Sequence, residues 1–418
     1  MRPWSARGTA TLAGADVRLR TYVQRIWQPS GVIDSPVSVT LGPAPSGHVV
    51  VEQYAVLPDP STVRFLVPMG SRPTTVAAFH TYNATRAPVS RVMRGTLARS
   101  YAVGLADRVF PHRLVVSVDR RFPKDQWGEV LVLRHLADVL GQPELRAFAA
   151  VRRINPNVKP TLELFDGSGV PVGFAKLGTT AGTRHLVRTE AAALAALRGR
   201  LESVIVPDLL DAGDWGEVAY AVSRPLPPDL RRWTRGPYAA MQAMSTVTRS
   251  GVVSRGPLAN STYAARLHAD IEGVGGCDEV VQVLGHWLTR LEREASPIEF
   301  GRMHGDWIPD NLGRSGSQLV AWDWEHSTDD APVGFDLLHW HFHLAFVKRG
   351  MRAAVGEMEA ATPQLGLLDV PAESRRLIAS LYLLDVFVRR MKLAHGGGGW
   401  NKRWYPGLLE VASTRDVE

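Results

Sequence analysis

The residues best suited to catalysis lie in one segment, Met303–Glu325, which reads MHGDWIPDNLGRSGSQLVAWDWE. Asp306 is followed five residues later by Asn311, and Asp323 ends an apolar strand predicted over Leu319–Trp322. Mg²⁺ prefers hard oxygen ligands and usually keeps waters and substrate phosphates in its octahedral shell. Asn311 and Asp323 could supply the protein ligands, which leaves Asp306 to face a substrate hydroxyl. This combination is what a phosphoryl-transfer site requires, and we favour it over an ordinary surface turn rich in Asp and Asn.

Three motifs carry a resemblance to a known family. HGDWIPDNL, VAWDWE and GFDLLHW resemble the aminoglycoside phosphotransferase and choline kinase group, small-molecule kinases with a protein-kinase-like fold. The resemblance implies Asp306 as the catalytic base and Asn311 and Asp323 as magnesium ligands. It also implies His304 as a support of the loop and Asp336 as the residue that holds the loop from behind. For Asp336, a carboxylate that interacts with a helix dipole is an equally good explanation.

The segment after residue 145 has the strand order of a kinase N-lobe. Three antiparallel strands are predicted over 146–154, 161–165 and 170–177, followed by a helix over 183–198 and two more strands over 204–213 and 218–225.

Lys176 lies near the end of the third of these strands, and Glu190 follows fourteen residues later in the helix. In the kinase arrangement a strand lysine contacts the nucleotide phosphates and pairs with a helix glutamate. The resemblance assigns these roles to Lys176 and Glu190, although either residue alone could be a surface charge. The chain has no GxxxxGK[ST] motif, and the loop between the first two strands has no glycine. The sequence therefore leaves open how the triphosphate is covered.

The first 145 residues predict a small α/β module without a catalytic constellation. Residues 1–45 predict irregular structure with at most one strand. The other expected elements are strands over 48–57, 61–67 and 113–118 and helices over 74–83, 89–107 and 126–140.

Composition limits the class of protein and its partners. Of 418 residues, 45% are hydrophobic and 21% charged, as in ordinary globular proteins. We expect no membrane partner because no apolar run reaches eighteen residues, and no secretion signal is recognisable. The single cysteine, Cys277, fits a reducing cytoplasm. Residues 1–150 hold 18 Lys+Arg and 10 Asp+Glu, a net +8 that leaves −1 for the remainder. We interpret this excess as a solvated face and expect no nucleic-acid partner.

The sequence LLHWHFHLAF places three histidines close together. On a helix only His339 and His343 would share a face, and the sequence offers no Cys or well-spaced third carboxylate to complete a zinc set. We therefore expect histidines on a helix that packs below the catalytic loop. A glycine run over 396–399 predicts a flexible loop.

We therefore predict an α+β chain: an N-terminal α/β module (1–145), a kinase-like N-lobe with a small antiparallel sheet (146–225) and a mainly helical C-lobe (226–418). The expected activity is Mg²⁺-dependent transfer of the γ-phosphoryl group of ATP or GTP to a hydroxyl of a small molecule, such as a sugar, an aminoglycoside or a related polyol. One alternative is a non-catalytic kinase-like binding module. A protein kinase is another, but HGD in place of HRD and the short interval between Asp323 and Asp336 argue against it.

Overall fold

The computed structural model describes residues 12, 14–28, 35–81, 111–154, 158–251, 253–274 and 278–395. The chain divides into two compact units. Unit 1 comprises Met1–Ile154, Val158–Thr179 and Asp208–Asp229, and unit 2 comprises Asn155–Asn157, Thr180–Pro207 and Leu230–Glu418. Unit 1 is built on an antiparallel sheet and unit 2 is mainly helical, so the predicted α+β class is confirmed. Within the described part of the chain, no helix has the length and apolarity needed to cross a bilayer.

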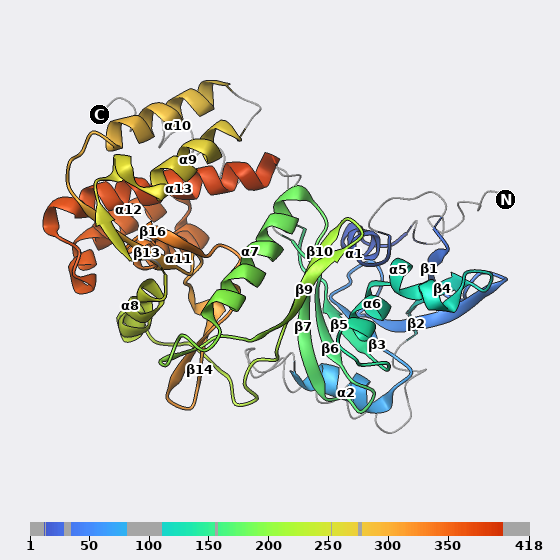
Figure 1. Cartoon of the computed structure of the whole chain (residues 1–418). Helices are drawn as coiled ribbons and strands as arrows, with labels where there is room; N and C mark the ends of the chain where they lie inside the picture. The colour runs from blue at the N-terminus through green and yellow to red at the C-terminus, as the bar shows by residue number, and fades with distance from the viewer. Residues whose placement is uncertain are drawn as a thin grey trace. The chain divides into compact units, whose positions relative to one another are not determined.

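Unit 1 contains one nine-stranded sheet in the order β1-β4-β2-β3-β5-β6-β7-β10-β9, and every neighbouring pair is antiparallel (Figure 1). Its strands are β1 (Val37–Leu41), β2 (His48–Leu57), β3 (Phe65–Pro68), β4 (Arg113–Asp119), β5 (Arg146–Ala150), β6 (Thr161–Phe165), β7 (Pro171–Gly178), β9 (Leu209–Trp215) and β10 (Val218–Ser223). The strands predicted for the N-terminal module and for the N-lobe thus belong to one sheet. They meet where β3 pairs with β5, at Phe65↔Ala150 and Leu66↔Ala149.

The sheet buries apolar side chains on both faces. Successive residues of a strand point to opposite faces, and in β2 Tyr54 and Val56 belong to a larger core whereas Ala55 and Leu57 belong to a smaller one. The larger core also takes side chains from helices α1 (Val17–Trp27) and α6 (Val132–Val139), and the smaller one takes side chains from α2 (Arg72–Thr81).

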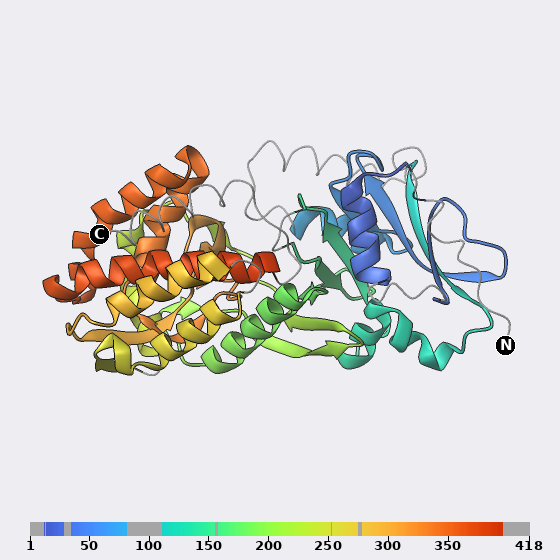
Figure 2. The same ribbon diagram turned by 90° about the horizontal axis from the view of Figure 1, so that it is seen from above.

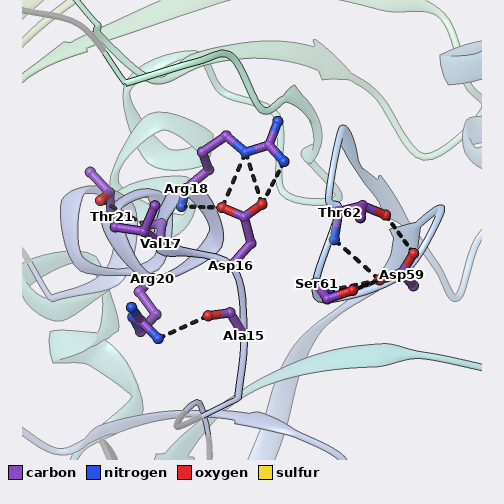
Figure 3. Close-up of polar contacts among 9 residues, drawn as sticks. All are labelled: Ala15, Asp16, Val17, Arg18, Arg20, Thr21, Asp59, Ser61 and Thr62. Carbon is purple, nitrogen blue, oxygen red and sulfur yellow. Dashed lines mark hydrogen bonds and ion pairs between the residues drawn. The ribbon is translucent and has the colours of Figure 1, made fainter.

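Helix α1 lies in a stretch that the sequence predicted to be irregular, so that prediction was wrong. Asp16 caps the helix by accepting a hydrogen bond from the Arg18 N–H at 2.7 Å, and its carboxylate also binds the Arg18 guanidinium (Figure 3). The Asp16 N–H donates to the Pro60 carbonyl, in a turn organised by the Asp59 carboxylate. The apolar face of α1 includes Leu19, Tyr22, Val23 and Ile26, and its 3.6-residue period was the overlooked signal.

The helix predicted over 126–140 is two helices, α5 (Trp127–Val130) and α6, separated at Leu131. Leu131 has extended backbone angles, φ −126° and ψ 110°, and its side chain is buried. The predicted helix over 89–107 and the glycine run over 396–399 lie outside the described residues, as does Cys277.

Unit 2 contains two small sheets and a set of packed helices. One sheet has the order β11-β14-β15-β8 and the other β12-β13-β16. The strands are β8 (Val204–Ile205), β11 (Arg231–Arg232), β12 (Ser254–Gly256), β13 (Ile298–Met303), β14 (Leu312–Ser315), β15 (Gln318–Ala321) and β16 (Thr328–Pro332). The helices are α7 (Ala181–Leu197), α8 (Met241–Arg249), α9 (Thr262–Glu272), α10 (Asp278–Leu291), α11 (Phe335–Arg349), α12 (Met351–Ala361) and α13 (Arg375–Leu393). Helix α13 packs against α9, α10 and α11, and Figure 2 shows its long course through the unit.

The strand predicted over 204–213 is interrupted. Val204–Ile205 forms β8, which pairs in parallel with β15 in unit 2, and β9 begins only at Leu209 in unit 1. Pro207 lies between the two strands, and proline cannot donate a hydrogen bond to a sheet ladder. The predicted domain boundaries at 145 and 225 remain predictions.

Candidate functional site

The HGD segment forms the connection between β13 and β14. Gly305 has φ +83°, and a Cβ there would lie 2.2 Å from the His326 carbonyl oxygen, so no other residue fits this turn. The fully buried His304 closes the loop on itself. Its Nδ1 accepts from the Asp306 N–H at 3.2 Å, and its Nε2 therefore donates to the Trp322 carbonyl at 3.0 Å. One imidazole thus connects the loop to the residue that follows β15.

Asp336 supports the same turn from α11. Its Oδ2 accepts from the His304 N–H at 2.8 Å and its Oδ1 from the Gly305 N–H at 2.9 Å. Asp336 also lies in the first turn of α11, so both explanations given for it from the sequence describe real features of its position. Burial raises the pKa of Asp336, although the two N–H donors oppose this shift. Arg389 of α13 donates to the Gly305 carbonyl at 3.0 Å, which adds a third anchor for the loop.

Asp306 and Asn311 are brought together as the spacing predicted. The Asn311 amide nitrogen donates to Asp306 Oδ2 at 2.7 Å and to the Asp306 carbonyl at 3.0 Å. The Asn311 Oδ1 is thus the atom of this amide that could ligate a cation. The backbone of Asn311 is held in turn, because its carbonyl accepts from the Trp322 N–H.

His339 is the functional residue that the sequence interpretation missed. Its Nε2 lies 2.9 Å from Asp306 Oδ1, and its Nδ1 lies 2.9 Å from the Tyr382 hydroxyl of α13. Burial lowers the pKa of His339 to about 4, so the ring is neutral at pH 7. Because a carboxylate can only accept, the proton is on Nε2, and Nδ1 accepts from Tyr382. A usable signal existed, since Asp336 and His339 are three residues apart and share a face of a helix.

The hydrogen bonds decide the charge of Asp306. Burial raises the pKa of this carboxyl, but the His339 hydrogen bond and the neighbouring imidazoles outweigh burial and hold its pKa well below the usual range. The Asp306 side chain is 22% exposed, so a substrate can reach it. The result is an ionised, accessible carboxylate whose orientation is fixed from two sides.

A second group of carboxylates lies in the same unit. Glu190 of α7, Asp323 and Glu325 each offer an oxygen within 4.8 Å of the others. Asp323 adopts φ +70°, a conformation that is strained for a non-glycine residue and common at functional sites. Three carboxylate oxygens fit a hard cation such as Mg²⁺. The sequence prediction named Asn311 and Asp323 as metal ligands and did not include Glu325. It gave Glu190 a different role, as the ion-pair partner of Lys176.

Lys176 lies in β7, where its backbone pairs with Thr161 of β6 and Ala221 of β10. Lys176 belongs to unit 1 and Glu190 to unit 2, so their pairing remains a prediction. The metal-binding role of Asn311 and the nucleotide-binding role of Lys176 also remain predictions.

The histidines of α11 differ from the sequence interpretation in one respect. His339 and His343 share a face as predicted, and a possible ligand atom of Asp306 lies within 4.8 Å of those of both histidines. The sequence interpretation did not include this carboxylate. That carboxylate lies 33 residues away in the chain, and only the tertiary fold brings it to the helix.

Comparisons with known proteins gave structural matches only. No protein-family model matches the sequence, and no curated protein matches it. Among solved structures, the chain is similar to an amicoumacin kinase in complex with AMP-PNP and Ca²⁺ (12% identity, TM-score 0.43, 71% of this chain and 94% of that one). It is also similar to a putative fructosamine-3-kinase from Thermobifida fusca (18%, 0.38, 69% and 99%). A glucosamine kinase matches over 93% of this chain and 95% of its own (14%, 0.32).

Proposed function

We propose that this chain is a small-molecule kinase that transfers the γ-phosphoryl group of ATP or GTP to a hydroxyl of a sugar, an aminoglycoside or a related polyol. The observation that carries the proposal is the Asp306 carboxylate, which is ionised, 22% exposed and held by Asn311 and His339. A carboxylate of this kind can accept a hydrogen bond from an acceptor hydroxyl and fix its direction of attack.

In the proposed reaction the acceptor oxygen forms a bond to the γ-phosphorus while the bond to the bridging oxygen of the nucleotide breaks. The hydroxyl proton passes to Asp306, and the nucleoside diphosphate leaves with the bridging oxygen. Since such transition states are loose, positioning of the hydroxyl matters more than its full deprotonation. His339 and Asn311 contribute by fixing the carboxylate before the acceptor arrives.

The acidic cluster provides the cation site in this scheme. Glu190, Asp323 and Glu325 would hold Mg²⁺, with the Asn311 amide oxygen as a further donor. A bound Mg²⁺ would neutralise the phosphate charge that develops during transfer. By the resemblance, Lys176 would contact the nucleotide phosphates.

The test is release of ADP or GDP over a panel of sugars, amino sugars, aminoglycosides and choline, with Mg²⁺ present. Asp306→Asn should lower turnover by about 10²- to 10⁴-fold, the contribution of a general base. Asp310→Asn is the matched control, because Asp310 lies in the same loop but its side chain is 77% exposed and forms an ion pair with the exposed Arg232. Equal turnover of wild type and Asp306→Asn would refute the role of Asp306. Nucleotide binding without turnover on any acceptor would favour a non-catalytic binding module.

A further inference from the structure

Asp306, His339 and His343 form a mixed nitrogen and oxygen cluster that the proposed reaction does not require as a unit. Each residue offers one ligand atom, and these atoms lie within 4.8 Å of one another. His339 and His343 are one turn apart on α11, with ring centroids separated by 5.7 Å. Among the residues that the structure describes, the buried His343 Nδ1 atom has no hydrogen-bond partner. Such an atom is costly to bury and is satisfied if it binds a ligand.

This donor set favours a different kind of cation than the acidic cluster of Glu190, Asp323 and Glu325 does. Two imidazoles and one carboxylate suit zinc and related divalent transition metals, whereas Mg²⁺ prefers oxygen ligands alone.

The geometry requires only small movements. Ligand atoms around a tetrahedral zinc ion lie about 3.4 Å apart, as follows from bonds of about 2.0–2.1 Å. His339 Nε2 and Asp306 Oδ1, now 2.9 Å apart, would open slightly, and the ligand atoms of the other two pairs already lie within 4.8 Å of one another. The Tyr382 hydroxyl can rotate to accept from Nδ1–H, which frees Nε2 for the metal and orients the ring. The exposed part of Asp306 gives the ion a path of entry.

We propose that Asp306, His339 and His343 form a binding site for zinc or a similar divalent transition metal, distinct from the magnesium cluster. Occupancy would remove the Asp306 lone pair that faces the acceptor and would separate Asp306 from its His339 hydrogen bond. Zinc would therefore inhibit phosphoryl transfer while the magnesium cluster remains available. The binding site stands on the cluster itself, and the inhibition rests on the proposed function.

Zinc binding is tested without any activity. The untagged full-length protein competes with a chromophoric chelator for ZnCl₂ in buffer free of Mg²⁺ and nucleotide. We expect one zinc ion per chain and at least a tenfold loss of affinity in His343→Ala, as for other losses around a metal centre. His341→Ala is the matched control, because His341 lies on the same helix but outside the cluster. It should bind zinc within twofold of wild type.

Thermal unfolding checks that the variants are folded and gives a second measure of binding. Zinc should raise the melting temperature of wild type and His341→Ala but not that of His343→Ala. Equal zinc affinity of wild type and His343→Ala would overturn the site. So would an equal loss of affinity in His341→Ala, since the binding would then not depend on this cluster.

Inhibition is measured at fixed Mg²⁺ and nucleotide. Zinc should lower the turnover of wild type, and a chelator should restore it. With inhibition expressed relative to each protein's own zinc-free turnover, His343→Ala should need at least tenfold more zinc for half-inhibition than wild type. Equal inhibition of both proteins would overturn the inhibitory role. Zinc binding that depends on His343 in a protein that phosphorylates none of the acceptors would support the metal site and count against the kinase, so the two proposals can fail separately.

Discussion

The hydrogen bond between His339 and Asp306 offers the sharpest test of the site. In His339→Phe the ring remains but both nitrogens are lost, so Asp306 Oδ1 loses its donor at 2.9 Å and Tyr382 loses its acceptor. A hydrogen bond to a charged group contributes about 1.5–3 kcal/mol. If this stabilisation is what fixes the carboxylate for the transition state, its loss lowers kcat by about 10- to 150-fold, at 1.36 kcal/mol per factor of ten.

The conservative partner variant is His339→Gln, because the Gln amide nitrogen can reach the position of His339 Nε2 and donate to Asp306. We expect it to recover most of kcat. The acceptor KM should change much less than kcat in both variants, because His339 contacts Asp306 and the acceptor contacts only Asp306 in the proposed reaction.

The pH dependence of kcat distinguishes a role of His339 in orienting Asp306 from a role in packing alone. The hydrogen bond from His339 favours the ionised form of Asp306. In wild type the pKa of Asp306 therefore lies below the assayed pH range. Without His339 the pKa of Asp306 rises, and the acidic limb of the kcat profile should move to higher pH in His339→Phe but much less in His339→Gln. Full activity of His339→Phe would refute the reasoning. An equally inactive, well-folded His339→Gln with an unmoved acidic limb would reduce His339 to a packing residue.

Three further predictions concern one group beside Asp306, one in the acidic cluster and one in the sheet of unit 1. Asp336→Asn should lower the free energy of unfolding by about 3 kcal/mol. The Asn side chain has one oxygen that can accept from one of the two N–H donors, and its NH₂ group would face the other donor. An unchanged denaturant midpoint would contradict this. Glu325→Gln should raise the Mg²⁺ concentration for half-maximal turnover at least tenfold, and an unchanged requirement would remove Glu325 from the cation site. Burial raises the pKa of Glu163 from 4.5 to about 8 in the folded state. The folded protein thus binds the extra proton between these values, and wild-type stability should fall as pH rises through this range, by at most about 1.4 kcal/mol per pH unit. Glu163→Gln should remove this contribution, and an identical slope would contradict it.

The sequence predicted that Asp306 and Asn311 lie close together, and the roles given to them remain predictions. The five-residue separation of Asp306 and Asn311 spans a single tight loop, so the contact between them follows from the chain's own path. Asp323 lies two residues after the end of β15, close to its predicted place at the end of a strand. Such contacts are short-range, and a sequence motif predicts them because few backbone conformations are compatible with its residue spacing.

The tertiary part could not be predicted in the same way. His339 and Tyr382 approach the loop from α11 and α13, and Glu190 approaches Asp323 from α7. Periodicity shows which face of a helix is apolar, but it does not show which loop that face covers. The continuity of the nine-stranded sheet has the same cause, because the pairing of β3 with β5 joins segments about eighty residues apart in sequence.

The choice of neutral partners for Asp306 has a chemical consequence. A guanidinium at the position of His339 would also orient the carboxylate, but its positive charge would compete with the acceptor hydroxyl for the same lone pairs. Neutral His339 and Asn311 supply directional hydrogen bonds and leave the full negative charge of Asp306 directed at the substrate. The same neutrality makes the imidazole nitrogens able to bind a soft divalent metal. The feature that keeps Asp306 reactive is therefore also the feature that exposes it to zinc, and His343 determines how strongly.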